Sequence, residues 1–367
     1  MTGWRSRTWK LTALFAAVSL VIAACGDEDP EDEGVDEQPD AADEEDAADE
    51  EDAADEEDAA DEDDAADDDA AAADDDWPES LRFGVTPADD AAGQEERFGA
   101  MVTALEEDLG MDVEFFTASS YAGLIEGLIS GDLDFAVMSP FAYVIATGQG
   151  AEIDARAAYI RAPGAEPTYQ AYGLARADSD ITELAEYEGQ RVCFVDPGSA
   201  SGFLVPSAGL MELGIDPEAD VAEAIFAGGH DNSVLAIQDG SCDAGFAVDS
   251  MLPRMEDTGE VEPGEIDIIW ESPPIAGVAM AVQTSLPQSL QDAIAESFLE
   301  NDGETLYDRG LCHDDWVEED GPDGETVCVA FGIGIWGFEA VDDAMYDGVR
   351  EVCEITEAPA CTDPEAG

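Results

Sequence analysis

Two hydroxyl side chains, Ser199 and Ser201, stand in a stretch of small residues at 196–206. The apolar run at 192–195 predicts a short buried strand before this stretch, and apolar residues at helical spacing over 204–213 predict a helix after it. A turn between strand and helix directs unpaired backbone N–H groups and the positive end of a helix dipole at one point. The stretch is therefore suited to holding an oxyanion, although either serine could instead only cap the helix.

Strands and helices alternate on both sides of this stretch. Strands are expected at 81–87, 113–116, 135–138, 224–226, 244–248 and 266–270, and helices at 94–109, 121–130 and 231–239. Such alternation predicts a parallel sheet, whose ligands lie beyond the carboxyl ends of the strands. Thr86, Tyr121 and Ser139 all fall at or soon after such ends.

The alternation forms two units, and the chain is expected to cross between them near 170–176 and near 270–276. We therefore predict an α/β protein with two hinged lobes and a ligand cleft between them. The predicted limits are 77–172 and 271–367 for lobe 1 and 173–270 for lobe 2. Amphipathic helices expected at 288–301 and 342–355 should pack on lobe 1.

The N-terminus has the layout of an export signal. A basic start is followed by an apolar stretch at 11–23, which is short for a membrane span, and then by small residues before Cys25. This pattern resembles a bacterial lipobox and predicts a lipoprotein signal peptide at 1–24, with lipid attached to Cys25. The protein would then be extracytoplasmic and lipid-anchored to the cell membrane. An ordinary secretory signal with an incidental cysteine is the alternative.

Residues 25–76 form an acidic segment of low complexity. Between 26 and 76 lie 31 of the 91 acidic residues of the chain and no Lys or Arg. Such a segment cannot collapse around a core, and self-repulsion extends it, so we expect a disordered tether. Binding of calcium or of a basic partner is the alternative.

The charge balance excludes nucleic acid as a partner. The chain has 91 Asp and Glu against 12 Lys and Arg, which gives a formal charge of −79. The two histidines, His230 and His313, do not stand at metal-ligand spacing, and no CxxC pair occurs. We therefore expect neither a metal site nor a cofactor.

Six cysteines follow Cys25, and an even number in an exported chain indicates three disulfides. The sequence alone allows fifteen connectivities. Proximity along the chain favours Cys193 with Cys242, Cys312 with Cys328, and Cys353 with Cys361.

Several blocks resemble the phosphate/phosphite/phosphonate-binding proteins of ABC importers. They lie at 81–87, 121–143, 196–206, 228–234 and 271–275, in the order of that family. The most specific is Asp-Pro-Gly-Ser-x-Ser-Gly with a downstream His-Asp pair. The resemblance implies a two-lobed fold of the periplasmic-binding-protein type (type II). Such a protein closes on an oxyanion and delivers it to a permease and its ATPase.

The resemblance also assigns roles by position. Ser199 and Ser201 would donate hydroxyls and helix N-terminal amides to the anion, and His230 would donate from the neighbouring turn. The other implied contacts are Tyr121 from lobe 1, Tyr169 from the hinge and Ser139 on the floor of the site. Neutral donors can hold a tetrahedral anion without a cationic pocket.

Two departures from the family pattern bear on the ligand. Ala200 stands where Thr is usual between the serines, and residues 276–278 are Ala-Gly-Val where Pro-Asn-Asp is common. The second change removes a carboxylate expected to bind a ligand amine, although Asp249 remains a candidate acidic contact. We therefore expect phosphate, phosphite or a simple alkylphosphonate rather than an aminophosphonate.

Each candidate residue has a structural alternative. His230 could cap the helix that starts beside it, Tyr121 and Tyr169 could be surface aromatics, and Asp249 could be a cap or a hinge contact. Arg82 and Arg97 are interpreted as ion-pair partners rather than ligand contacts.

Three functional alternatives stay open at this point. The first is a sensory binding protein that presents a small anion to a membrane receptor. The second is a binder of another anion, such as a sulfonate. The third, a hydrolase using Ser201, His230 and Asp231, is disfavoured because no G-x-S-x-G motif occurs and an Asp next to the His projects away from it on a helix.

Overall fold

The computed structural model describes residues 76–87, 91–313, 317–318, 326–329 and 335–362. The chain divides into two units, Met1–Asp68 and Asp69–Gly367, and the described residues all belong to the second. The predicted signal peptide, Cys25 and the acidic tether up to residue 75 lie outside the described residues. Within the described ranges, no helix combines the length and the apolar character needed to cross a membrane.

Lobe 1 is built on a six-stranded sheet with the order β15-β4-β12-β3-β1-β2. Its strands are β1 (Ser80–Val85), β2 (Asp112–Thr117), β3 (Phe135–Met138), β4 (Ile153–Ile160), β12 (Ala279–Gln283) and β15 (Gly337–Ala340). β1 pairs in parallel with β2 and β3, whereas β12 and β15 run antiparallel to their neighbours. Within this sheet, parallel pairing is therefore confined to β1, β2 and β3. β12 arrives from the other lobe and β15 from the C-terminal segment, so neither follows a local helical crossover.

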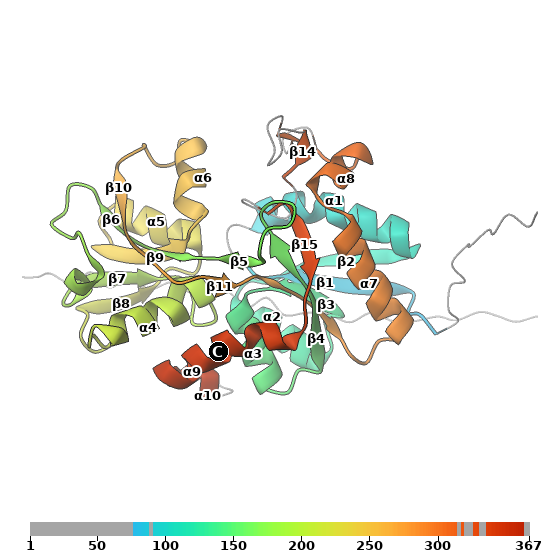
Figure 1. Ribbon diagram of the computed structural model, residues 1–367, viewed down its shortest axis with the longest axis horizontal. Coiled ribbons are helices and arrows are strands. Elements are labelled where there is room, and N and C mark those ends of the chain that lie inside the picture. The colour runs from blue at the N-terminus through green and yellow to red at the C-terminus, as the bar shows by residue number, and fades with distance from the viewer. Residues whose placement is uncertain (1–75, 88–90, 314–316, 319–325, 330–334, 363–367) are drawn as a thin grey trace, which may run out of the picture. The chain divides into compact units, whose positions relative to one another are not determined.

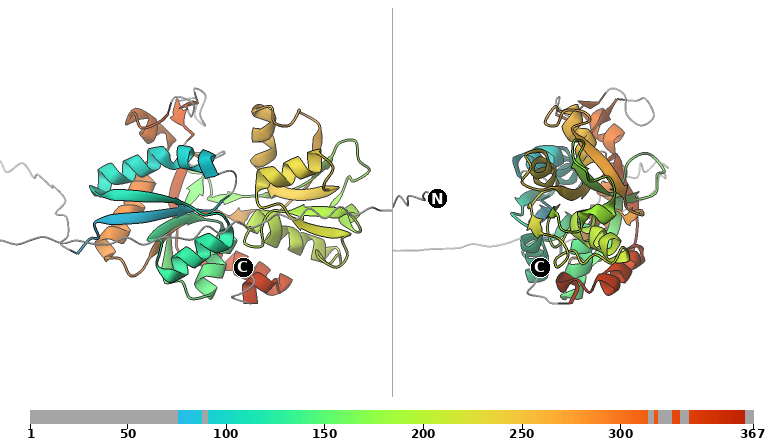
Figure 2. Two further views of the ribbon diagram at one scale, coloured as in Figure 1. Left: turned by 180° about the vertical axis from the view of Figure 1, so that it is seen from behind. Right: turned by 90° about the vertical axis from the view of Figure 1, so that its left-hand side faces the viewer.

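Helices cover both faces of this sheet, as Figure 2 shows. They are α1 (Ala91–Leu109), α2 (Tyr121–Ser130), α3 (Pro140–Gly148) and α7 (Gln288–Glu300). The shorter α8 (Gly303–Asp308) contacts α1 and the strand β14 (Val327–Cys328) of the C-terminal segment. The side chain of Ser120 caps the start of α2 by accepting from the Gly123 N–H, and Gly131 in the left-handed region (φ 74°) ends it. These two signals fix α2 at the residues that the sequence predicts.

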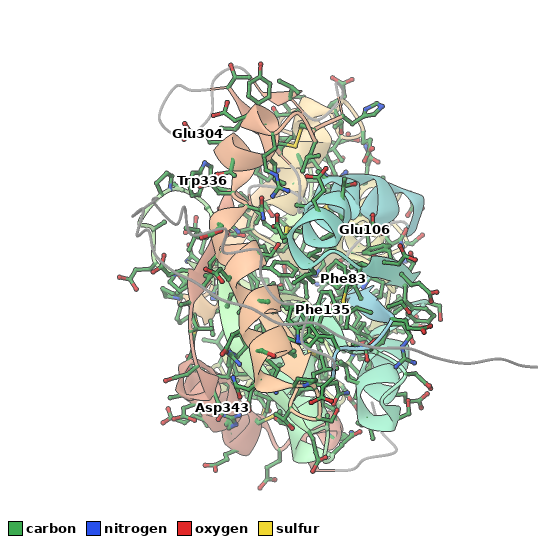
Figure 3. All side chains as sticks on the ribbon, turned by 90° about the vertical axis from the view of Figure 1, so that its right-hand side faces the viewer. Phe83, Glu106, Phe135, Glu304, Trp336 and Asp343 are labelled. Carbon is green, nitrogen blue, oxygen red and sulfur yellow. A yellow bond between two sulfur atoms is a disulfide. The ribbon has the colours of Figure 1, made fainter. Side chains whose placement is uncertain are left out.

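Aromatic rings fill the core of lobe 1. Phe83 is fully buried and stacks on Phe135 with ring centroids 4.7 Å apart (Figure 3). Phe98 from α1, Phe115 from β2 and Phe298 from α7 meet the Phe83 ring edge-on. Through these contacts Phe83 packs β1 against β2, β3, α1 and α7.

Lobe 2 is built on a five-stranded sheet with the order β10-β6-β9-β7-β8. Its strands are β6 (Ala171–Arg176), β7 (Arg191–Phe194), β8 (Glu223–Phe226), β9 (Ala244–Val248) and β10 (Ile266–Glu271). Its helical elements are η1 (Leu184–Tyr187), η2 (Ala200–Leu204), α4 (Val205–Glu212), α5 (His230–Gln238) and α6 (Met251–Asp257). β7 is parallel to β8 and β9, and β6 is antiparallel to β9 and β10. The strands of this sheet span residues 171–271, whereas the predicted limits of lobe 2 are 173 and 270.

The chain crosses between the lobes twice, and the crossings pair as the short antiparallel strands β5 (Thr168–Tyr169) and β11 (Ile275–Ala276) (Figure 1). The C-terminal segment contains β13 (Val317–Glu318), β14 (Val327–Cys328), η4 (Asp343–Tyr346), α9 (Asp347–Thr356) and α10 (Pro359–Thr362). α9 contacts α3 of lobe 1, β11 of the crossing and α4 of lobe 2. The C-terminal helix α9 therefore packs on lobe 1 as expected, and it also contacts lobe 2, which the sequence did not predict.

All three disulfides favoured by proximity are present: Cys193–Cys242, Cys312–Cys328 and Cys353–Cys361. The first lies fully buried in lobe 2 and ties β7 to the loop before β9. The third ties α9 to α10 at the C-terminus.

Replacing Phe83 by Ala should lower the free energy of unfolding by about 3–5 kcal/mol, because it leaves a cavity among four aromatic rings. Phe116 on the neighbouring strand is 51% exposed and provides the matched control. Phe116→Ala should change the same quantity by less than about 1 kcal/mol. Urea denaturation followed by tryptophan fluorescence measures both, and equal losses would contradict the assignment of the core.

Candidate functional site

A cavity of about 130 Å³ is lined by Val85, Val137 and Val248, which lie at or next to the carboxyl ends of β1, β3 and β9. The predicted site residues that line it are Tyr121, Ser139, Tyr169, Ser199, Ser201 and His230. All of these side chains are buried. Pockets for drug-sized ligands typically enclose roughly 300–1,000 Å³, so this cavity suits a much smaller molecule.

The turn at 196–199 is held by its own side chains. The Asp196 carboxylate accepts from the Gly198 N–H at 2.8 Å, and the Ser199 N–H donates to the Asp196 carbonyl at 2.9 Å. Ser199 Oγ then accepts from the Gly202 N–H at 3.0 Å and so caps the π-helical turn η2 that leads into α4. Ser199 is thus both a helix cap and a cavity residue, and its hydroxyl proton stays available for a ligand.

Gly202 lets this turn approach the end of β7. A Cβ atom at Gly202 would lie 2.3 Å from the Val195 Cβ, a distance that no side chain tolerates. The Gly202 carbonyl accepts from the Val195 N–H at 3.1 Å, which closes the turn onto the strand. This close packing places Ser199 and Ser201 next to the carboxyl end of β7.

His230 is a neutral donor with a fixed tautomer. Its Nδ1 accepts from the Val248 N–H at 2.9 Å, so the ring proton resides on Nε2. The side chain is 4% exposed, and burial lowers the pKa of His230 to about 4. At neutral pH the imidazole can therefore donate one hydrogen bond from Nε2 without carrying charge.

Ser139 and Tyr121 of lobe 1 contact the turn of lobe 2. Ser139 Oγ donates to the Gly198 carbonyl at 3.3 Å and accepts from the Ala200 N–H at 3.4 Å. A Cβ at Gly198 would lie 3.0 Å from the Tyr121 Cβ, so the two lobes touch closely beside the cavity. These contacts describe a closed cleft.

Tyr169 reaches the cavity from the crossing strand β5. Burial raises the pKa of Tyr169 well above its usual value, and the smaller effect of the neighbouring Ser201 hydroxyl acts in the opposite direction. Tyr159 beside it is also buried, and burial likewise raises its pKa. Both phenols therefore remain protonated and can donate to an anion.

Arg97, for which the sequence interpretation favoured an ion-pair role over a ligand contact, lines the cavity. Its side chain is 6% exposed, and Arg97 is the cationic residue among the described residues of the lining. Arg82, by contrast, pairs with Asp134 as expected, with Nε 3.2 Å from Oδ2. Arg97 lies on α1, the helix that follows β1 along the chain, and that position was the available signal.

Two predicted residues are not on the cavity lining. Ala200 is buried, and its N–H donates to Ser139 Oγ. Asp249 forms an ion pair with Arg161 and accepts from the Gln170 N–H at 3.1 Å, which is the arrangement of a hinge contact. The described lining contains neither Asp nor Glu.

The rest of the lining is largely apolar. Its members include Val85, Phe98, Val137, Val248, Met251, Val278 and Ile335. The cavity thus combines several polar donors with apolar side chains in one small lining.

Two α/β lobes, joined by two crossing strands and enclosing a small cavity of hydrogen-bond donors, define a substrate-binding protein of the periplasmic type, with the type II fold. Over residues 83–346 the sequence matches the family described as the periplasmic phosphonate substrate-binding proteins of ABC transporters. The chain belongs to this family.

Named relatives and solved structures agree with this placement. The phosphate-import protein PhnD of Mycolicibacterium smegmatis is 41% identical over 294 residues, which are 78% of this chain and 88% of that protein. The phosphonates-binding periplasmic protein of Escherichia coli is 25% identical over 64% of this chain and 69% of its own length. PhnD1 from Prochlorococcus marinus, solved in complex with methylphosphonate, shares the fold with a TM-score of 0.64 at 15% identity, covering 76% of this chain and 99% of its own.

The buried imidazole predicts a specific loss of stability in acid. The pKa of His230 is about 4 in the folded protein and roughly 6.5 in the unfolded chain, so its contribution is present above pH 6.5 and is lost as the pH falls toward 4. His230→Asn keeps an acceptor for the Val248 N–H but cannot titrate. Between pH 7 and pH 4.5 the free energy of unfolding should fall about 2–3 kcal/mol more in the unmodified protein than in the variant. Parallel curves in urea denaturation would contradict the assignment.

Proposed function

We propose that the protein is the extracytoplasmic substrate-binding lipoprotein of an ABC importer for phosphate, phosphite or a simple alkylphosphonate. Its cleft would close on the oxyanion, and the closed protein would deliver it to the permease and its ATPase. The observation that carries this proposal is the set of buried, uncharged donors around the cavity: the hydroxyls of Ser199, Ser201 and Tyr169 and the Nε2–H of His230. Arg97 adds one positive charge.

The lining argues against an aminophosphonate. A buried ammonium group needs a carboxylate partner, and the described lining provides none. Asp249, the candidate for that role, is engaged by Arg161. A small substituent such as hydrogen or methyl fits the apolar part of the cavity instead.

The names of the relatives support the same class of ligand. The mycobacterial protein is named for phosphate import, the Escherichia coli protein for phosphonates, and the Prochlorococcus protein was solved with methylphosphonate.

The site favours binding without catalysis. In a serine hydrolase the histidine base must accept the serine proton, but His230 carries its proton on Nε2 and its Nδ1 is engaged by the Val248 N–H. A pKa of about 4 further weakens His230 as a base at neutral pH.

We also propose that lipid on Cys25 anchors the protein and that the acidic segment at 25–76 spaces it from the membrane. Cys25→Ser should move the protein from the membrane fraction to the soluble fraction of a bacterial expression host, as followed by immunoblot. Cys361→Ser, which removes a cysteine from the C-terminal disulfide, is the control and should stay with the membrane. An unchanged distribution of the Cys25 variant would contradict the anchor.

Ser199→Ala and Ser201→Ala should each weaken oxyanion binding by about tenfold to a hundredfold, because each removes a hydrogen bond to a charged group. Calorimetric titration with phosphate, phosphite, methylphosphonate, 2-aminoethylphosphonate and methanesulfonate measures this. Ser285→Ala, at an exposed position, is the control and should bind like the unmodified protein.

The titration also separates the ligand classes. Preference for the aminophosphonate would contradict the argument from the missing carboxylate. A preference for methanesulfonate would indicate that the protein binds sulfonates rather than phosphorus oxyanions. Absence of binding for all five anions would contradict the proposed function.

A further inference from the structure

Helix α1 brings a second polar side chain to the cavity, one turn before Arg97. Gln94 is 2% exposed and lines the cavity. Its Nε2 donates to the Thr86 carbonyl at 3.0 Å. Because that carbonyl can only accept, the amide group has a fixed orientation, with Nε2 toward Thr86 and Oε1 away from it.

Gln94 Oε1 is buried, and among the described residues it has no hydrogen-bond partner. A buried carbonyl oxygen without a donor is costly, so most such atoms in proteins are satisfied by a partner, often a ligand or water. Here the other polar groups around the cavity supply donors: the serine and tyrosine hydroxyls, the His230 Nε2–H and the Arg97 guanidinium. Hydroxyl groups can rotate to accept as well, but the amide oxygen of Gln94 can only accept.

The ligand that complements this set is an anion that carries one donor of its own. Monoprotonated phosphorus oxyanions have such a donor in their P–OH group, and the second ionisation of these acids lies close to neutral pH. Sulfate and sulfonates have the same tetrahedral shape but carry no proton at this pH. The carbonyl oxygen would then face a ligand oxygen with no hydrogen between them, which is repulsive.

We infer that Gln94 is a specificity-determining residue, whose Oε1 accepts a hydrogen bond from the P–OH group of a phosphate or phosphonate and so excludes sulfate and sulfonates. This inference rests on the proposed function and narrows its substrate class to protonated phosphorus oxyanions. The same geometry explains how a neutral amide can discriminate between anions of equal size.

Gln94→Met tests this assignment, because Met has a similar length and lacks the amide oxygen. Calorimetric titration at pH 7 compares phosphate with sulfate and methylphosphonate with methanesulfonate. The variant should lower the preference for each phosphorus anion over its sulfur analogue by at least tenfold. Gln149→Met, the same substitution outside the cavity, is the control and should leave both preferences unchanged.

A second measurement needs no variant. Methylphosphonate loses its only P–OH on its second ionisation, whereas phosphate still keeps one. When the pH exceeds the second pKa of methylphosphonate, the affinity for methylphosphonate should fall about tenfold per pH unit. The affinity for phosphate should stay within about threefold between pH 6 and pH 9. The titratable and charged side chains that face the cavity are Arg97 on α1, Tyr121 on α2, Tyr159 on β4, Tyr169 on β5 and His230 on α5. Burial keeps Tyr159, Tyr169 and His230 uncharged over this range.

The outcomes separate the inference from the function on which it rests. If the unmodified protein binds phosphorus anions but Gln94→Met keeps the full preference, or if methylphosphonate affinity does not fall with pH, the role of Gln94 is overturned and the proposed function survives. An equal loss for all four anions in Gln94→Met would indicate a purely structural role and would also overturn it. If no anion binds to the unmodified protein, the proposed function fails as well.

Discussion

The hydrogen bond from the Val248 N–H to His230 Nδ1 is the interaction on which the cavity depends most. It joins the end of β9 to the start of α5 and leaves a single proton on Nε2. Burial then keeps the ring neutral, so His230 can donate without the cost of an enclosed charge. The Ser199 cap follows the same principle, because the bond from the Gly202 N–H uses the acceptor capacity of the hydroxyl and leaves its proton for the ligand.

Closure of the cleft depends on contacts from three directions. Ser139 of lobe 1 bonds to the turn at 198–200, the Arg161–Asp249 ion pair joins a crossing segment to the end of β9, and α9 contacts both lobes. Opening must therefore break or shift each of these contacts. None is strong in isolation, since a partly exposed ion pair and two long hydrogen bonds contribute modestly. A ligand that bridges the donors of both lobes can thus shift the balance toward the closed form.

The strand, turn and helix around Ser199 and the start of α2 could be predicted from the sequence because their signals are local: an apolar run, small residues and a capping serine. β4 and β12 could not, because their alanine-rich sequences lack the β-branched alternation of a strand. β15 could not, because it has only four residues and its place depends on a distant partner strand. Gln94 was missed, and Arg97 was assigned an ion-pair role, for a related reason. On a helix they look like ordinary surface residues, and only the packing of α1 against Thr86 at the end of β1 brings them to the cavity. Asp249 was a candidate ligand contact, although it does not line the cavity. The sequence does not show that Arg161 forms an ion pair with it.

The most direct test of the account is a crystal structure of the protein with methylphosphonate at near-neutral pH. The account predicts one phosphonyl group in the cavity, its oxygens within hydrogen-bond distance of Ser199, Ser201 and His230 Nε2, and its methyl group against the apolar part of the lining. A phosphonate bound outside the cavity, or a His230 ring whose Nδ1 rather than Nε2 meets the anion, would contradict it.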